Sequence, residues 1–157
     1  MPNSKPILLV EDDRLDVMAV RRVLLELHVS NELVHVEDGE DALTHLRSHL
    51  DVPPCLILLD LNMPRMNGFE FLEALRADDG LKHIPVVMVS TSLERQDIRR
   101  SFELGIVAYV NKCPDYGQFQ RSMRVIEDYV TEARLLDGLK TESHKAEGSF
   151  VLDGHRL

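Results

Sequence analysis

Cysteine is scarce in this chain, and long apolar runs are absent from it. Cys55 and Cys113 are the only cysteines among 157 residues, too few for a disulfide framework or a cysteine metal cluster. No apolar stretch approaches the roughly 20 residues of a membrane-spanning helix. The apolar stretch nearest the N-terminus, Ile7 to Val10, is too short for a signal peptide. These absences predict a cytoplasmic protein without a membrane segment.

Basic residues are also in the minority. The chain has 18 Lys and Arg against 27 Asp and Glu, which gives a formal net charge of −9. A dispersed negative charge promotes solubility and argues against nucleic-acid binding. Hydrophobic residues make up 44% of the chain, and its length is enough to enclose a core. We therefore expect one soluble globular domain.

The most informative segment is the apolar run that ends at Asp60. Four large apolar residues, Leu56 to Leu59, lead directly into this carboxylate, and Pro64 closes the segment. A continuous apolar run of this length is typical of a strand buried on both faces, as in a parallel sheet. Asp60 would then lie at the carboxyl end of the strand, where open α/β sheets bind their ligands.

A second apolar strand, Ile7 to Val10, also ends in acidic residues, namely Glu11, Asp12 and Asp13. Parallel strands that bring carboxylates to one edge of a sheet form an acidic pocket. Hard divalent cations take oxygen ligands of this kind. The sequence therefore predicts a divalent-cation site at this edge.

Strand-like and helix-like segments alternate along the rest of the chain. Asp13 is the expected N-cap of the first helix, Thr91 and Glu94 have the spacing of a capping box, and Gly105 is expected beyond a C-cap. The expected strands are 7–10, 33–36, 56–60, 86–89 and 107–110, and the expected helices are 15–27, 39–50, 69–75, 92–104 and 115–136. Five such βα units predict an α/β fold with a doubly wound parallel sheet and helices on both faces.

The residues that follow the strand ends resemble the receiver domain of two-component response regulators over about residues 5 to 130. Four motifs, in order and at the spacing of that family, carry the resemblance. They are the acidic pair Glu11-Asp12, the segment LLDLNMPRMNGFEFL with Asp60, the hydroxyl of Ser90, and the pair Tyr109 and Lys112 in aromatic-x-x-Lys. The resemblance implies a flavodoxin-like sheet with strand order 2-1-3-4-5 and a long C-terminal helix. It also implies a receiver domain over residues 5–137.

The resemblance assigns a chemical role to each residue at the acidic edge. Asp60 is the expected phosphoacceptor, whose carboxylate attacks a phosphohistidine donor. Mg²⁺ is the expected cofactor, because a divalent cation relieves the repulsion between neighbouring carboxylates. The implied metal ligands are Glu11, Asp12, Asp60 and the backbone carbonyl of Asn62.

The remaining residues are implied to contact the phosphoryl group and to report its presence. Lys112 and the Ser90 hydroxyl are expected to contact phosphoryl oxygens. Ser90 would move toward the phosphate while Tyr109 turns inward, which changes the surface of the fourth helix and fifth strand. Structural interpretations compete, because a carboxylate can simply cap a helix and Tyr109 can simply fill the core. Asp60 is harder to explain in this way, since an unpaired charge beside four apolar residues is costly.

Two positions depart from the family pattern. Thr91 stands after Ser90 where receivers usually have a smaller residue, so access of water and partners to the phosphoryl group should differ. Cys113 separates Lys112 from Pro114, whereas the family lysine is normally followed directly by a proline with a cis bond. A non-proline cis bond costs about 2.5–4 kcal/mol, so the cis geometry is not carried over.

The C-terminal part of the chain bears on assembly. No output domain is expected after residue 137, so output should occur through protein contacts, and the extension 138–157 is expected to be mobile or involved in assembly. One apolar set on the last helix suits packing on the sheet, and a second set is rotated away from it. The first set is Phe119, Ile126, Val130 and Ala133, and the second is Val125, Tyr129 and Leu136. The second set is either part of a wide core-facing stripe or a surface shared with a second copy in a homodimer.

The layout as a whole is similar to the small regulators paired with bacterial phytochrome kinases. It implies a sensor histidine kinase of phytochrome type as phosphoryl donor, and a downstream protein target. A phosphorelay intermediate that passes phosphate to a histidine phosphotransfer protein is the alternative. An aspartyl-phosphate hydrolase is less favoured, because such enzymes generally need a second Asp where Asn62 stands. We therefore expect a phosphoacceptor signalling protein and not an enzyme.

Overall fold

A single parallel sheet organises the part of the chain that the computed structural model describes, residues 4–139 and 150–152. Its strand order is β2-β1-β3-β4-β5-β6, and every pair is parallel. The strands are β1 (Ile7–Val10), β2 (Leu33–Val36), β3 (Leu56–Leu59), β4 (Val86–Ser90), β5 (Ala108–Asn111) and β6 (Phe150–Leu152). The predicted α/β fold and the order 2-1-3-4-5 are confirmed.

The sixth strand was not predicted. β6 lies within the extension 138–157 and pairs with β5 through Ala108↔Phe150 and Val110↔Leu152. Three apolar residues are too few to be distinguished by pattern from an irregular tail. The rest of that extension, apart from the last two residues of the final helix, lies outside the described residues, so its predicted mobility stays a prediction.

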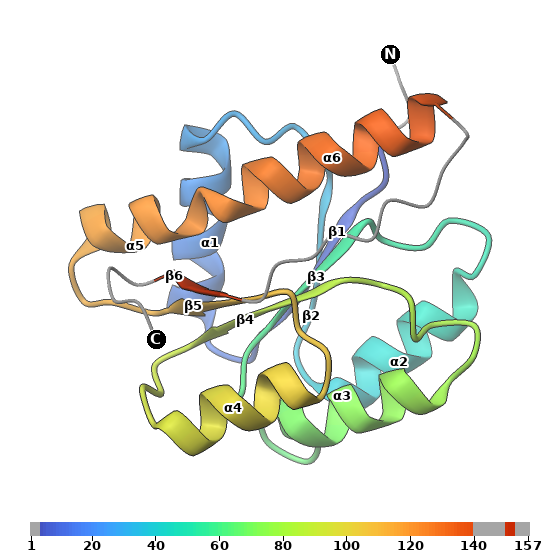
Figure 1. Ribbon diagram of the computed structural model, residues 1–157, viewed down its shortest axis with the longest axis horizontal. Coiled ribbons are helices and arrows are strands. Elements are labelled where there is room, and N and C mark those ends of the chain that lie inside the picture. Colours follow the sequence, from blue (N-terminus) through green and yellow to red (C-terminus); the bar gives the residue numbers. More distant parts are fainter. Residues whose placement is uncertain (1–3, 140–149, 153–157) are drawn as a thin grey trace.

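Helices cover both faces of the sheet (Figure 1). On one face lie α1 (Arg14–Glu26), α5 (Tyr116–Met123) and α6 (Val125–Leu139), and on the other lie α2 (Gly39–Ser48), α3 (Gly68–Ala77) and α4 (Arg95–Glu103). None of the helices in these described segments is long and apolar enough to cross a membrane. The strands are therefore enclosed between two helical layers, which explains their continuous apolar runs.

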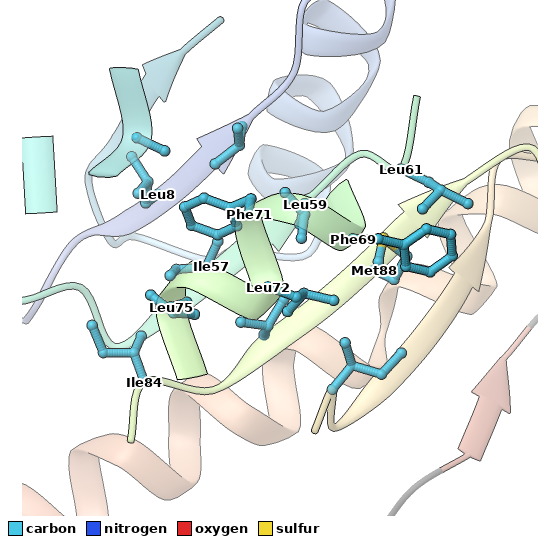
Figure 2. Packing of buried hydrophobic residues seen from close by; sticks show 14 of the residues in the cluster. Leu8, Ile57, Leu59, Leu61, Phe69, Phe71, Leu72, Leu75, Ile84 and Met88 are labelled. Atoms are coloured by element: carbon cyan, nitrogen blue, oxygen red, sulfur yellow. The ribbon is translucent and has the colours of Figure 1, made fainter. Parts of the chain in front are cut away.

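Two apolar clusters, one on each face, hold the layers together. Alternation along the strands assigns Leu8 and Ile57 to the α2–α4 side and Leu9 and Leu58 to the α1–α5–α6 side. Figure 2 shows the first cluster, where Phe71, Leu72 and Leu75 of α3 lie close to β3 residues Ile57 and Leu59. Full burial of each such side chain contributes about 1.5–3 kcal/mol. This packing on both faces holds the strands, and therefore the residues at their carboxyl ends, in place.

The helix ends agree with the sequence analysis at two places and differ at a third. Asp13 caps α1, accepting hydrogen bonds from the backbone of Leu15 and Asp16, and Gly105 has φ +88 beyond the end of α4. The predicted capping box of Thr91 and Glu94 is wrong. α4 begins only at Arg95, and its N-cap Glu94 makes no side-chain cap hydrogen bond. Ser92 makes the side-chain hydrogen bonds before this helix instead. Its Oγ accepts from the Glu94 backbone N–H and donates to the Asp97 carboxylate.

The long C-terminal helix is present but interrupted. A turn at Arg124 separates α5 from α6, and the Glu127 backbone N–H bonds to the Arg124 carbonyl across it. For the second apolar set of the last helix, the structure supports the core-facing alternative at two of its three residues. Val125 is buried, and Tyr129 packs against the core with its hydroxyl donating to the Val107 carbonyl. These two residues therefore belong to the wide core-facing stripe, while the Leu136 side chain lies outside what the structure describes.

Candidate functional site

An acidic cluster lies at the carboxyl ends of β1 and β3. Carboxylate oxygens of Glu11, Asp12 and Asp60 all lie within 4.8 Å of one another. The register of the sheet is responsible, because Val10 pairs with Leu59 and the backbone N–H of Asp60 donates to the Val10 carbonyl. Glu11 and Asp60 are buried, with exposed fractions of 2% and 6%, whereas Asp12 is exposed. Two of the three carboxylates are thus buried, and the third is open to solvent.

Lys112, which directly follows β5, reaches across to this cluster. Its Nζ lies 2.6 Å from Glu11 Oε1, 3.2 Å from Asp60 Oδ1 and 2.8 Å from Asp16 Oδ2. The side chain is only 12% exposed, so the ammonium is surrounded mainly by carboxylates and little by water. Sequence analysis predicted that Lys112 would lie near Asp60 and Glu11, and the structure brings these three residues together.

Burial sets the protonation behaviour of the cluster. It raises the pKa of Glu11 to about 7 from an ordinary 4.5, although Lys112 acts in the opposite direction, and the charge of Asp60 adds to the increase. Burial likewise raises the pKa of Asp60, again against Lys112. For Lys112 burial acts to lower the pKa, but Asp60, Asp16 and Glu11 outweigh it and the pKa is raised. One ammonium therefore does not fully compensate the buried carboxylates, and a further cation would be favoured there.

The donor set fits a hard divalent cation. The three clustered side chains all offer carboxylate oxygens, which are the ligands that Mg²⁺ and Mn²⁺ prefer over nitrogen and sulfur. Asn62 is exposed, and its backbone N–H bonds to the Asp60 carboxylate. The role of its carbonyl as the fourth metal ligand stays a prediction.

The loop after Asp60 is held close to the strand end. A side chain on Gly68 would place its Cβ 2.7 Å from the Asp60 carbonyl oxygen and 2.9 Å from Leu61 Cα, so only glycine allows this approach. Farther along the loop, Arg65 forms an ion pair with Asp38, the N-cap residue of α2. These contacts fix the backbone from which the Asp60 side chain projects.

Ser90 and Tyr109 form a neighbouring group that is neutral and fully hydrogen bonded. The buried Ser90 Oγ accepts from the Ser92 backbone N–H at 3.1 Å, and the Tyr109 hydroxyl donates to the Ser92 carbonyl at 2.8 Å. Tyr109 is fully buried, so its ring already occupies the interior position that the sequence analysis expected after phosphorylation. Ser92 connects both predicted switch residues to the start of α4, a link that the sequence did not reveal.

The two cysteines lie apart from this chemistry. Cys55 and Cys113 are not joined in a disulfide, and the Cys113 thiol donates to Gln118 Oε1 at 3.4 Å. No cis peptide bond occurs among the described residues, so the Lys112-Cys113-Pro114 segment runs entirely through trans bonds. This segment therefore differs from the family pattern, in which a cis bond joins the lysine to the proline.

Asp16 is the site residue that the sequence analysis missed. It lies in the first turn of α1 and bonds to Lys112. Its sequence signal was weak, because an acidic residue in the first turn is also what the helix dipole favours. Only the packing of α1 against the end of β5 shows that this carboxylate faces the lysine.

Comparison with known proteins agrees with this arrangement. Residues 7–124 match the family model of the response regulator receiver domain. The response regulator Rcp1 of Synechocystis sp. is 35% identical over 132 residues, covering 82% of this chain and 90% of that protein. The acidic cluster, Lys112, Ser90 and Tyr109 all lie within the range that matches the family model.

Solved structures extend the likeness to three dimensions. The phosphorylated cyanobacterial phytochrome response regulator RcpA aligns with a TM-score of 0.72 at 37% identity, covering 81% of this chain and 94% of that one. The Mn²⁺-bound form of response regulator Rcp1 aligns with a TM-score of 0.64 at 30% identity, covering 92% of this chain and 99% of that one.

Proposed function

Since this chain belongs to the response regulator receiver family, we propose that it accepts a phosphoryl group on Asp60 and signals through protein contacts. The observation that carries the proposal is the placement of Lys112 against Asp60 and Glu11 within the acidic cluster. Transfer of a phosphoryl group to an aspartate requires a nucleophilic carboxylate, a fixed positive charge and oxygen ligands for a cation. We further propose that residues 5–137 form the receiver and that 138–157 serve assembly.

In the proposed reaction an oxygen of ionised Asp60 attacks the phosphorus of a phosphohistidine. A phosphorus–oxygen bond forms and the phosphorus–nitrogen bond breaks, and the departing imidazole takes the bonding electrons and a proton from solvent. Lys112 contributes by donating to a phosphoryl oxygen, where negative charge accumulates. Its pairing with Asp60 also favours the ionised carboxylate, because burial raises the pKa of Asp60 and Lys112 acts to lower it.

A divalent cation completes the proposed site. Receiver domains bind Mg²⁺ at an acidic site of this kind, and Glu11, Asp12 and Asp60 would hold it here, with the Asn62 carbonyl as a further ligand. When bound, the ion neutralises the carboxylates and the phosphoryl oxygens. The Mn²⁺ in the related Rcp1 structure supports a cation of the same class.

The switch would operate through Ser92. The Ser90 hydroxyl, on turning to donate to a phosphoryl oxygen, would give up the hydrogen bond from Ser92. Ser92 also accepts from Tyr109 and precedes α4, so its release would change the entry of that helix. This route would alter the α4–β5 surface without moving the Tyr109 ring into the core.

The names of related proteins support a proposal for the phosphoryl donor. RcpA is named as a phytochrome response regulator, which supports a phytochrome-type histidine kinase as the donor for this chain. We also propose a cytoplasmic homodimer that uses the C-terminal helix, where Leu135 of α6 is 62% exposed. A downstream protein target would read the phosphorylated state.

Labelling with acetyl phosphate tests the proposal. With Mg²⁺ present, intact-mass measurement should show one added phosphoryl group, and hydroxylamine should release it because acyl phosphates react with this nucleophile. Asp51→Asn, which removes an exposed carboxylate outside the site, is the matched control and should label normally. Absence of labelling in the wild-type protein, or a hydroxylamine-resistant label, would contradict the proposal. Transfer to a histidine phosphotransfer domain would identify a relay intermediate.

A further inference from the structure

Lys112 has three carboxylate partners, and one of them lies outside the acidic cluster. A lysine ammonium has three N–H donors, and Glu11, Asp60 and Asp16 account for all three. Glu11 and Asp60 belong to the group whose oxygens lie within 4.8 Å of one another, whereas Asp16 does not. A cation in the cluster would therefore compete with Lys112 for two partners and leave the third untouched.

Asp16 is held in a fixed position by the start of α1. Its backbone N–H donates to Asp13 Oδ1 at 3.3 Å, as part of the N-cap, and its Oδ2 lies 2.8 Å from Lys112 Nζ. Its side chain is 38% exposed, against 2% for Glu11 and 8% for Asp60. The lysine thus spans a buried pair of acids and one acid at the solvent boundary.

We propose that Asp16 is a positioning residue that retains Lys112 when a divalent cation and the phosphoryl group take over Glu11 and Asp60. A mostly buried ammonium that loses its partners is costly, because nothing replaces the lost charge pairing. Asp16 removes that cost by offering a carboxylate that neither the cation nor phosphorylation consumes. The role in phosphoryl transfer rests on the proposed function, but the effect on cation binding does not.

The proposal predicts coupling between Asp16, Lys112 and the cation. With Asp16→Asn, Lys112 should remain on Glu11 and Asp60, and Mg²⁺ affinity should fall about tenfold, which is in the range of coupling between contacting charged groups. In a Lys112→Met background the same Asp16→Asn change should alter Mg²⁺ affinity by less than about twofold, because the lysine that it positions is gone.

A double-mutant cycle on the full chain measures this coupling. Mg²⁺ binding is followed by displacement of Mn²⁺, whose free form is quantified by electron paramagnetic resonance. Asp13→Asn is the matched control, because asparagine still caps the helix while a charge close to the cluster is lost. Thermal unfolding of each variant verifies folding, and Lys112→Gln replaces Lys112→Met if the latter lacks a cooperative transition.

Each result decides the matter. A large loss of affinity with Asp16→Asn that disappears without Lys112 supports the proposal. An equal loss in both backgrounds, or an equal loss with Asp13→Asn, would show a plain effect of charge and overturn it, as would no loss at all. Failure of acetyl phosphate to label the wild-type protein would instead contradict the proposed function and leave this cycle interpretable.

Discussion

Two groups of polar residues lie side by side at the same edge of the sheet. One is charged, and the other is neutral and hydrogen bonded. Glu11 and Asp60, which both pair with Lys112, have carboxyl pKa values that burial raises. The group of Ser90, Ser92 and Tyr109 is neutral, and its hydroxyls are hydrogen bonded. In the proposed function the first group reacts with the phosphoryl donor and the second responds to the product. Changes in the two groups should therefore separate chemistry from response.

The largest effect is expected from Asp60→Asn compared with Tyr109→Phe. Asp60→Asn removes the nucleophile from the charged cluster and should abolish labelling by acetyl phosphate while the fold survives. Tyr109→Phe changes only the neutral group and should label at close to the wild-type rate. Intact-mass measurement over time gives both results. Full labelling of Asp60→Asn would show that another residue is the acceptor.

The next effect concerns Lys112→Ala. Loss of the ammonium removes the charge that meets the phosphoryl oxygens, so the labelling rate should fall by about 10²–10³, the size typical of one lost transition-state donor. Mg²⁺ affinity should be retained or increased, because Lys112 no longer competes for Glu11 and Asp60. Rates come from the labelling time course and affinities from Mn²⁺ displacement. Unchanged labelling would remove Lys112 from the mechanism.

The pH dependence of the charged cluster should be opposite without and with Mg²⁺. Because the pKa of Glu11 is about 7 in the folded protein and 4.5 ordinarily, the folded state binds the extra proton, and metal-free stability should decline as pH rises from about 4.5 to about 7. Mg²⁺ binds the ionised carboxylate, so its stabilising effect should grow over the same interval. Thermal unfolding of wild type and Glu11→Gln measures both. Identical pH profiles for the two proteins would refute the assignment to Glu11.

The smallest effect is expected from the neutral group. Tyr109→Phe leaves the Ser92 carbonyl without its donor and should cost about 1 kcal/mol in unfolding free energy. The change on phosphorylation in hydrogen exchange at the start of α4 should also shrink, since the link through Ser92 is lost. Ser101→Ala, which removes a hydroxyl bonded to Asp97 within α4, is a control that should keep the response. An unaltered response in Tyr109→Phe would exclude the proposed route.

Features set by strong local patterns could be predicted from the sequence. The apolar runs that end at Asp60 and Glu11 placed both acids at one edge, because parallel strands buried on both faces allow little else. Asp13 and Gly105 were predicted as helix-end residues from side-chain and backbone preferences alone. The order of the receiver motifs, with Lys112 in the aromatic-x-x-Lys motif after the fifth strand, predicted that Lys112 belongs to the same site as Asp60.

Features that depend on tertiary contacts could not be predicted in this way. The contact of Asp16 with Lys112 requires the packing of α1 beside β5, and the pattern of α1 does not contain it. Ser92 was passed over because Thr91 and Glu94 matched the capping-box spacing, while the chain actually uses Ser92 and starts α4 later. The core contacts of Val125 and Tyr129 likewise depend on how α6 packs against the sheet, which the sequence pattern left open.

Borohydride reduction of the phosphorylated protein, followed by peptide mass spectrometry, tests the central claim most directly. Reduction of an aspartyl phosphate leaves homoserine at the modified position. The account predicts homoserine at Asp60 alone, and only in samples that received both acetyl phosphate and Mg²⁺. Homoserine at Asp12 or at another aspartate, with Asp60 intact, would contradict it.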